Sequence, residues 1–377
     1  MRAPYTYLEF FAGGGMARLG LGDHWIPLLA NDIDSQKCAA YRMNFGSDEL
    51  IEGDIAALDP QALPATAVDL MWGSFPCQDL SLAGARGGIN AKRSGVFFDF
   101  WRHAQTLIAS GRTPRIIALE NVTGLLTSHE GRDFAVIVNL LADHGYRVTA
   151  TIIDAKQFTP QSRPRLFIMA FAKDVKITKR SGAAKVCDIQ PTDHFSQVAR
   201  KAWFPLACEP QANSRRNHRL SDIIDWKADT WHDAEKTVQL INMMAPHQRK
   251  RIDALIASKA KRCGAAFRRT RQENGRSVQR LEARFDGVAG CLRTPAGGSS
   301  RQLIIAVENG GVRTRLLSAR EAARLMGLPE DYRLPQSETA ALKLCGDGIC
   351  VPVVQWLAET VFEPALASVS QHDIAAA

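Results

Sequence analysis

One cysteine stands where a reactive thiol would be expected. Cys77 follows the apolar run 68–72, which predicts a buried strand, so its thiol would lie at the carboxyl edge of a sheet. A free cysteine is usually buried and only fills space. Here Pro76 fixes the preceding backbone, and Gln78 and Ser81 follow with polar side chains. This setting indicates a nucleophile.

Further polar groups follow two later apolar runs. Glu120 and Asn121 end the predicted strand 115–120, and a glutamate there would lie beside Cys77 if the two strands are neighbours. Gln161, Arg163 and Arg165 surround the start of another predicted strand. One guanidinium can reach a substrate carbonyl while the other braces the loop. Taken singly, each of these side chains could also be structural.

The segment after the cysteine, 79–97, is rich in glycine and contains Arg86, Lys92 and Arg93. A long glycine-rich basic loop next to a nucleophile suits a lid that closes over an anionic substrate. An ordinary surface loop is the alternative, although long loops in compact domains are often functional.

A second kind of site is indicated near the N-terminus. The predicted strand 6–10 runs into Phe11-Ala12-Gly13-Gly14-Gly15, where glycines allow backbone N–H groups to approach a ligand. Asp32 ends the next strand and could accept hydrogen bonds from ribose hydroxyls. Asp54 ends the third element and could accept from an adenine amino group. The pattern predicts an adenosine ligand, and its incomplete GxGxxG spacing argues against a dinucleotide.

Composition limits the class of protein. The chain has 377 residues, of which 46% are hydrophobic and 23% charged, enough for a large core and two domains. Eight scattered cysteines without CxxC pairs suit the reducing cytoplasm and argue against disulfides and a zinc site. We find no signal-peptide pattern and no run of about eighteen apolar residues, so no membrane segment is expected.

The net charge of +8 is unevenly distributed. Residues 176–317 carry 27 Lys and Arg against 13 Asp and Glu, a balance of +14, whereas the remainder carries 20 against 26, a balance of −6. Such a basic segment in an otherwise acidic chain is typical of a nucleic-acid partner. A solvated surface is the alternative.

Short apolar runs alternate with helical patterns over residues 1–172, which indicates an α/β fold with a mostly parallel sheet. The segment 176–317 has weak periodicity, with a loop at 287–301, and a capping box, Ser318-Ala319-Arg320-Glu321, then begins a helix. We therefore predict a catalytic and cofactor-binding domain, 1–175 completed by 318–377, interrupted by an inserted domain, 176–317. The expected strands are 6–10, 27–31, 69–73, 115–120, 147–153 and 165–172, and the expected helices are 16–20, 35–44, 96–110, 134–144 and 352–362.

These motifs together resemble the bacterial DNA (cytosine-5)-methyltransferases, the modification enzymes that often accompany restriction endonucleases. The ordered set is Phe-Ala-Gly-x-Gly, Asn-Asp-x-Asp, Gly-Asp-Ile, Phe-Pro-Cys-Gln-x-x-Ser, Glu-Asn-Val, Gln-x-Arg-x-Arg and the stretch 317–332. The resemblance covers nearly the whole chain outside residues 176–285. It implies a Rossmann-like S-adenosylmethionine-dependent fold with a small inserted target-recognition domain.

The resemblance also implies a mechanism. The target cytosine is flipped out of double-stranded DNA, and the Cys77 thiolate adds to C6. Glu120 would contact N3 and the exocyclic amine, and Arg163 would hold O2 with Arg165 and Gln161 in support. The activated C5 would take the methyl group, and loss of its proton with elimination would free the thiol. Asn121 would position the backbone at residues 76–77.

The same resemblance assigns the ligand sites. The pocket for S-adenosylmethionine, with S-adenosylhomocysteine as product, would contain Phe11, Ala12, Gly13, Gly15, Asp32, Ile33, Asp54, Ile55 and Pro76. Gln78, Ser81 and Arg93 would approach DNA as the loop closes, and Arg293 and Arg301 would lie on a loop facing the DNA groove. Ile33 stands where an aromatic residue commonly stacks on adenine, and Asp347 stands where asparagine is usual, so the role of Asp347 is open.

Other readings remain. A tRNA cytosine-5 methylase of the same fold would use the same Pro-Cys-Gln chemistry, although the large basic insert favours duplex DNA. A catalytically silent DNA-binding protein conflicts with the presence of Cys77, Glu120 and Arg163. A nicotinamide-dependent oxidoreductase leaves Pro-Cys-Gln and the basic insert without a role. A monomer is expected from the resemblance, and neither the DNA recognition sequence nor a partner endonuclease can be deduced from the sequence.

Overall fold

A computed structural model describes residues 4–76, 95–177, 189–206, 218–295 and 301–367. The chain forms two compact units. The first unit consists of Met1–Asp154, Pro164–Gln211 and Val353–Ala377, and the second unit consists of Ala155–Arg163 and Ala212–Pro352.

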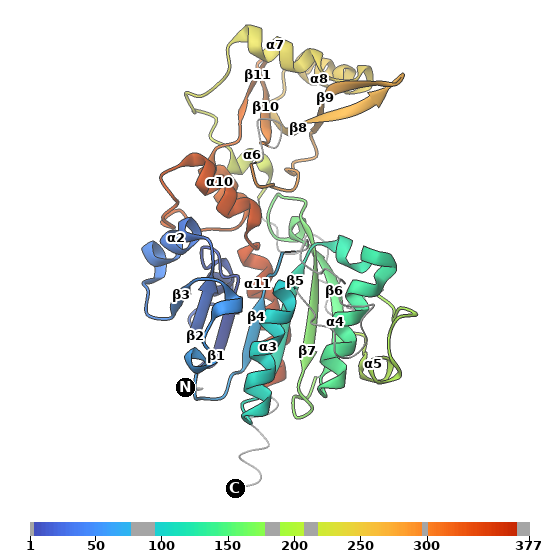
Figure 1. The fold of residues 1–377 in the computed structure, drawn as a ribbon. Helices are drawn as coiled ribbons and strands as arrows, with labels where there is room; N and C mark the ends of the chain where they lie inside the picture. The colour runs from blue at the N-terminus through green and yellow to red at the C-terminus, as the bar shows by residue number, and fades with distance from the viewer. Residues whose placement is uncertain (1–3, 77–94, 178–188, 207–217, 296–300, 368–377) are drawn as a thin grey trace. The chain divides into compact units, whose positions relative to one another are not determined.

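The first unit contains a seven-stranded sheet with the order β3-β2-β1-β4-β5-β7-β6 (Figure 1). Its strands are β1 (Tyr5–Phe10), β2 (Trp25–Asp32), β3 (Leu50–Glu52), β4 (Leu70–Gly73), β5 (Ile116–Asn121), β6 (Arg147–Asp154) and β7 (Pro164–Phe171). All neighbouring pairs are parallel except the two that involve β7, which runs antiparallel to both β5 and β6. The first residues of β7 therefore lie at the edge where β5 ends.

Helices cover both faces of this sheet, as expected for a sheet whose central strands are apolar on both sides. On one face, strand residues such as Leu8 and Phe10 pack with α3 (Val96–Ala109), α4 (Arg132–Asp143) and α5 (Gln197–Ala202). On the other face, Phe362 makes edge-on ring contacts with Trp25 and Trp72. Phe362 ends the π-helical turn η8 (Ala358–Phe362), which continues α11 (Val351–Leu357).

Shorter elements complete the first unit. The remaining helices are α1 (Met16–Leu21) and α2 (Ser35–Phe45), and the 3-10 turns are η1 (Ile55–Ala57), η2 (Pro60–Ala62), η5 (Thr123–Leu126) and η6 (Ser128–Gly131). The carboxylate of Asp34 caps α2 by accepting from the N–H groups of Gln36 and Lys37. This cap fixes the start of α2 directly after the end of β2.

The second unit contains a four-stranded antiparallel sheet with the order β11-β10-β8-β9. Its strands are β8 (Arg262–Glu273), β9 (Arg276–Arg284), β10 (Leu303–Glu308) and β11 (Gly311–Leu316). Its helical elements are η7 (Ala155–Gln157), α6 (Leu220–Ile223), α7 (Ala234–Asn242), α8 (Pro246–Ala257), α9 (Ala319–Leu325) and α10 (Glu338–Asp347). Apolar residues of α7 and α8 pack on one face of the sheet to form a small core.

A buried ion pair joins the sheet of the second unit to α9. The Arg315 and Glu321 side chains are each 1% exposed and form a two-pronged contact, one bond of which is 2.7 Å long. Glu321 also accepts from the backbone N–H groups of Asp225 and Ser318. Burial alone would raise the pKa of Glu321, but these hydrogen bonds outweigh burial and hold the pKa below its ordinary value.

The α/β class with a mostly parallel sheet and the six expected strands are confirmed, with bounds shifted by one or two residues. The capping box at Ser318 and Glu321 is present. The sheet of the second unit was not foreseen. The expected division at residues 175 and 317 also differs from the observed one, because α9, α10 and the segment Ala155–Arg163 belong to the second unit.

One helical stretch bears on the expectation that the chain has no membrane segment. The helical stretch Glu338–Ala367 is long and apolar enough by length and composition, but 72% of its most apolar window is buried inside the protein. Its apolar side chains are therefore used in packing, as in the core helix of a globular protein.

Replacement of Glu321 by Gln should destabilise the protein by about 3 kcal/mol, because it leaves the Arg315 charge buried without its carboxylate. Glu321→Gln combined with Arg315→Met removes both charges and should restore at least half of that loss. Urea unfolding followed by circular dichroism measures both. Since the pKa of Glu321 is lowered in the folded protein, the wild-type advantage should shrink as pH falls through that lowered pKa. Equal stability of the single variant and the wild type at pH 7 would contradict this account.

Candidate active site

The turn after β1 has an unusual backbone. Phe11, Gly13 and Gly15 all have positive φ angles, of 60°, 56° and 77°. A Cβ atom added at Gly15 would lie 2.4 Å from the Phe45 ring, so no other residue fits there without displacement. No atom lies within 4 Å of a Cβ added at Gly13, so the backbone at that position faces open space. The turn is therefore tight on one side and accessible on the other.

Asp32 fixes this turn. Its side chain is buried, with 8% exposed, and its Oδ2 atom accepts from the Gly13 N–H at 2.8 Å. Its Oδ1 atom accepts from the Asp34 N–H at 2.8 Å. Each carboxylate oxygen has a second lone pair, so Asp32 can hold the turn and still accept from a ligand.

Asn31 was not singled out from the sequence, yet it holds the next strand end in place. Its side-chain amide is buried and donates to the carbonyls of Ile51 and Gly53 at 2.9 and 3.0 Å. These bonds fix the segment immediately before Asp54. A buried asparagine directly before a predicted functional acid was the available signal.

The three remaining predicted cofactor residues of this edge differ in exposure. Asp54 is exposed, and its Oδ1 atom accepts from the Ala56 N–H at 2.9 Å. Ile55 is buried, whereas Ile33 is 68% exposed, the most exposed large hydrophobic side chain among the described residues. Ile33 stands between Asp32 and Asp34 in the sequence, and its exposed side chain could pack against the flat ring of a ligand.

Helix α3 supports the segment after Asp54. The buried His103 imidazole lies 3.0 Å from the Ile55 carbonyl through Nε2, and Arg102 donates to the Ala56 carbonyl at 2.9 Å. The imidazole also stacks on the Phe10 ring. Burial lowers the pKa of His103, so the neutral ring with Nε2–H is the form that donates to Ile55. Sequence reasoning missed this support because His103 has no recognisable motif around it.

A buried acid, Glu9, lies in β1 close to this turn. It is 2% exposed, and its Oε2 atom has no hydrogen-bond partner within the described part of the chain. Burial raises the pKa of Glu9 to about 8, Arg18 opposes that rise, and Asp32 adds to it. A lone acid within the apolar run 5–10 was the sequence signal, and it was overlooked.

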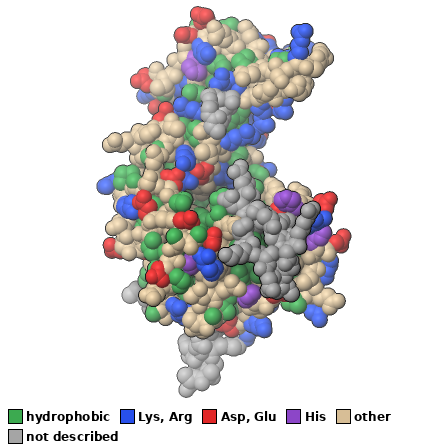
Figure 2. Space-filling model, viewed as in Figure 1, with side chains coloured by type: hydrophobic (Ala, Val, Ile, Leu, Met, Phe, Trp, Pro, Cys, Tyr) green, Lys and Arg blue, Asp and Glu red, His purple; other side chains and the backbone are tan. Residues whose placement is uncertain are grey.

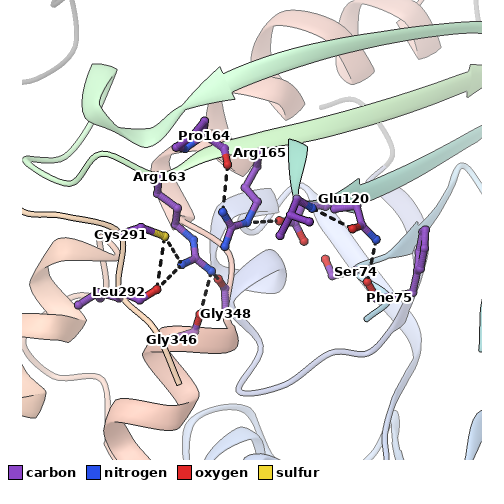
Figure 3. Close-up of polar contacts among 12 residues, drawn as sticks. Ser74, Phe75, Glu120, Arg163, Pro164, Arg165, Cys291, Leu292, Gly346 and Gly348 are labelled. Atoms are coloured by element: carbon purple, nitrogen blue, oxygen red, sulfur yellow. Dashed lines mark hydrogen bonds and ion pairs between the residues drawn. The ribbon is translucent and has the colours of Figure 1, made fainter. Parts of the chain in front are cut away.

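At the end of β5, Glu120 forms an ion pair with Arg165 (Figure 3). The Glu120 Oε1 and Arg165 Nε atoms are 3.0 Å apart, and Glu120 is 8% exposed. Arg165 also donates from Nη1 to the Pro164 carbonyl at 3.0 Å. The pairing follows from the register, since Asn121 lies opposite Leu166 and Arg165 is the next residue.

Asn121 ties the end of β5 to the chain that follows β4. Its side-chain amide donates to the Phe75 carbonyl at 3.0 Å, and its Oδ1 atom accepts from the Val122 N–H at 2.9 Å. The expected contact with the backbone at residues 76–77 is thus observed one peptide earlier. Pro76 is exposed, and Cys77 lies outside the described residues, as do Gln78, Ser81 and Arg93.

The structure separates Arg163 from Arg165. Arg163 is 2% exposed and belongs to the second unit, where it donates to the carbonyls of Leu292, Gly346 and Gly348 at 3.2, 3.0 and 2.7 Å. These carbonyls occupy both of its terminal nitrogens. Substrate contact was expected of Arg163, with Arg165 in support. Arg163 braces the backbone, and Arg165 lies beside Glu120.

Gln161 is likewise a brace. It is fully buried, donates from Nε2 to the Leu325 carbonyl at 2.9 Å, and accepts at Oε1 from the Leu292 N–H at 3.0 Å. Both contacts lie within the second unit. Support of substrate binding was expected of Gln161, and its observed contacts hold the backbone at residues 292 and 325.

Arg293 and Arg301, the residues of the second unit predicted to face DNA, both contact other side chains of that unit. The Arg293 guanidinium lies 5.6 Å from the centroid of the Phe267 ring, and Arg301 donates to Glu338 at 2.8 Å. Asp347 accepts a hydrogen bond from the Thr294 hydroxyl, which places it next to the same loop. Over the described residues, no group of three or more His, Cys, Asp or Glu side chains is arranged to hold a metal ion.

This arrangement joins a ligand-accessible turn, a buried acid-arginine pair and a tether to the cysteine segment at one edge of a seven-stranded sheet. A sequence model of the C-5 cytosine-specific DNA methylases matches residues 5–363. The chain belongs to this family. It is a DNA (cytosine-5)-methyltransferase, an enzyme that methylates C5 of cytosine in DNA.

Curated relatives of this methylase span nearly all of its length. It is 28% identical over 360 residues to the type II methyltransferase M.SsoII of Shigella sonnei, covering 95% of this chain and 80% of that protein. It is 29% identical over 365 residues to M1.ScrFI of Lactococcus lactis subsp. cremoris, covering 96% and 79%. The type II methyltransferase M.HhaI of Haemophilus parahaemolyticus is 25% identical, covering 94% and 93%.

Solved structures share the fold. The Dnmt2 methyltransferase of S. pombe superposes with a TM-score of 0.60 at 18% identity, covering 96% of this chain and 99% of that one. The Entamoeba histolytica methyltransferase EhMeth gives a TM-score of 0.61 at 15% identity, covering 96% and 99%. The expected Rossmann-like methyltransferase fold is thereby confirmed.

The raised pKa of Glu9 predicts a specific pH dependence of stability. Between the unfolded value of about 4.3 and the folded value of about 8, the folded protein binds a proton that the unfolded chain does not. The free energy of unfolding should therefore fall by about 2 kcal/mol between pH 6 and pH 8 from this group alone.

Glu9→Gln should remove that part of the slope, since glutamine does not titrate. Urea unfolding at both pH values measures it, with exposed Glu359→Gln as the matched control. An identical pH slope in wild type and Glu9→Gln would show that the carboxyl of Glu9 titrates normally.

Proposed function

We propose that this methylase transfers the methyl group of S-adenosylmethionine to C5 of a specific cytosine in double-stranded DNA, with Cys77 as the nucleophile. The observation that carries the proposal is the Glu120–Arg165 pair at the end of β5, next to Asn121, which holds the peptide of Phe75. On the hydrogen-bonding edge of cytosine, N3 and the O2 carbonyl are acceptors and the exocyclic amine is a donor. A carboxyl group and a guanidinium fixed side by side match that edge.

The residues of the first unit fit the cofactor. The open backbone at Gly13, the carboxylate of Asp32 and the exposed side chain of Ile33 would receive the methionine part, the ribose and the adenine. Asp54 would accept from the adenine amine, supported from behind by His103 and Arg102. When bound, S-adenosylmethionine supplies an electrophilic methyl group and leaves as S-adenosylhomocysteine.

The chemistry of the chain's own residues follows. With the cytosine flipped out of the duplex, the Cys77 thiolate forms a bond to C6, and electron density moves to C5. Negative charge also spreads to N3, where a proton donated by the Glu120 carboxyl group would neutralise it, while the other carboxyl oxygen accepts from the amine. With the methyl group supplied by the cofactor on C5, a base would take the C5 proton, the C5–C6 double bond would return, and the Cys77–C6 bond would break to free the thiolate.

The role of holding O2 is assigned to Arg165. Arg163 has both terminal nitrogens bonded to carbonyls of the second unit, whereas Arg165 lies 3.0 Å from the carboxyl group proposed to contact N3. A guanidinium beside that carboxyl group can reach the neighbouring O2 position. Arg163 acts as a positioning residue that holds the backbone of residues 292, 346 and 348.

The second unit is proposed to recognise the DNA sequence, in line with the positive charge of residues 176–317. The relatives are named type II methyltransferases, so a cognate restriction endonuclease is the proposed partner in the cell. We propose that the methylase acts as a monomer in the cytoplasm.

Transfer of labelled methyl from S-adenosylmethionine to mixed-sequence DNA, followed by mapping of 5-methylcytosine at single-base resolution, tests the function. We expect methylation within one short sequence, and none with Cys77→Ser, because serine is a far weaker nucleophile at neutral pH. Folded wild type that binds the cofactor but methylates tRNA and not DNA would instead identify an RNA methylase.

The two arginines should respond differently to substitution. Arg165→Gln should lower kcat by about 100-fold or more in protein that is still folded, because it removes a donor used in the transition state, and it should also reduce stability by leaving the buried Glu120 without its partner. Arg163→Gln should lower the melting temperature, because three buried carbonyls lose their donor. Single-turnover methylation and thermal unfolding of both variants measure this. A large kcat loss for Arg163→Gln at unchanged stability, with Arg165→Gln active, would reverse the assignment.

A further inference from the structure

Part of the second unit extends beyond its four-stranded sheet as a two-stranded ribbon. Strand β10 pairs with β8 only as far as Ala266, whereas β8 and β9 remain paired to their turn at Asn274 and Gly275. The paired segments 267–273 and 276–282 thus form a two-stranded ribbon, which spans about 23 Å at about 3.3 Å per residue. A two-stranded ribbon is only marginally stable on its own.

Arginines gather on one face of this ribbon. Alternate positions share a face, and the register places Arg269, Arg271, Arg276 and Arg280 together. Figure 2 shows Lys and Arg side chains in this part of the second unit. The opposite face is different, since Leu281 and Ala283 pack with α7 and α8. The basic face is therefore the one turned away from the small core.

The register brings like charges together. Arg269 lies directly opposite Arg280, an arrangement that destabilises a sheet. Glu282 lies 3.4 Å from Arg269 and also binds Arg271, and Glu273 binds Arg280. These two acids hold the guanidiniums in place but leave an excess, since the paired segments 267–273 and 276–282 contain five arginines and two glutamates.

We propose that this face, the arginine ribbon of Arg269, Arg271, Arg276 and Arg280, binds the phosphates of duplex DNA that flank the methylated sequence. The inference rests on the proposed function. Duplex DNA presents a phosphate about every 1.7 Å along its axis, so a ribbon of this length faces many of them. Contacts to phosphates carry no base information, and the ribbon contributes affinity and orientation on the duplex.

The test compares salt dependence of binding for two double variants. Arg269→Gln with Arg276→Gln removes two charges from the ribbon and leaves both glutamates their bidentate partners. Lys236→Gln with Lys250→Gln removes two exposed charges from α7 and α8 as the matched control. Dissociation constants are measured by fluorescence anisotropy between 50 and 300 mM salt, on duplexes of about 12 and about 30 base pairs centred on the mapped target.

On the longer duplex, the slope of log affinity against log salt should become shallower by about 1.8 for the ribbon variant, because each phosphate contact contributes about 0.9. The control variant should keep the wild-type slope, and the difference should diminish on the short duplex. Circular dichroism and thermal unfolding confirm that both variants are folded.

An unchanged slope for the ribbon variant, while the wild type methylates the same duplex, would overturn this proposal and leave the proposed function intact. Loss of a wild-type dimer in sedimentation, again with an unchanged slope, would assign the ribbon to a second copy of the chain. Failure of the wild type to methylate any DNA would instead refute the proposed function.

Discussion

The reversed direction of β7 is the constraint on which the Glu120–Arg165 pair, the proposed catalytic half of the site, depends. In a wholly parallel sheet, the start of every strand lies at the edge opposite the end of its neighbour. Because β7 runs antiparallel to β5, its second residue, Arg165, lies near the end of β5, where Glu120 is the last residue but one. An acid and a base from segments 45 residues apart are thus brought to 3.0 Å by topology alone.

The cofactor half of the edge depends instead on side chains that bond to backbone. Asp32 accepts from the N–H groups of Gly13 and Asp34, and Asn31 donates to two carbonyls near Asp54. Unpaired buried backbone groups are costly, so each of these side chains stabilises a strand end as well as shaping it. A residue assigned to ligand binding from its motif can therefore be equally important for the turn that presents it.

What the sequence could predict follows from these physical differences. Strands β1, β2, β4 and β5 are apolar runs followed by glycine or polar residues, so the pattern identifies them. In β8, only Cys263–Ala266 is buried and the remainder is rich in arginine, so the pattern of a half-buried strand is lost.

Which of the two arginines has which role could not be deduced from the sequence, because that too depends on distant contacts. Arg163 and Arg165 flank Pro164, and a motif of alternate arginines does not say which one is used by backbone carbonyls. That depends on Leu292, Gly346 and Gly348, which lie more than 120 residues away in sequence. The motif predicted that one arginine braces and one binds, and three-dimensional contacts were needed to distinguish them.

The second unit carries 27 Lys and Arg against 15 Asp and Glu, and this positive balance has more than one meaning. Arg315 is 1% exposed, and both of its terminal nitrogens donate to Glu321 and to backbone carbonyls, so it adds nothing to a DNA-binding surface. Arg163 is committed in the same way. The charge available to a polyanion is therefore smaller than the sequence count suggests, and it lies where exposed arginines outnumber their acids. Counting charges in the sequence indicates the class of partner. The burial and ion pairing of each arginine decide which surface can bind that partner.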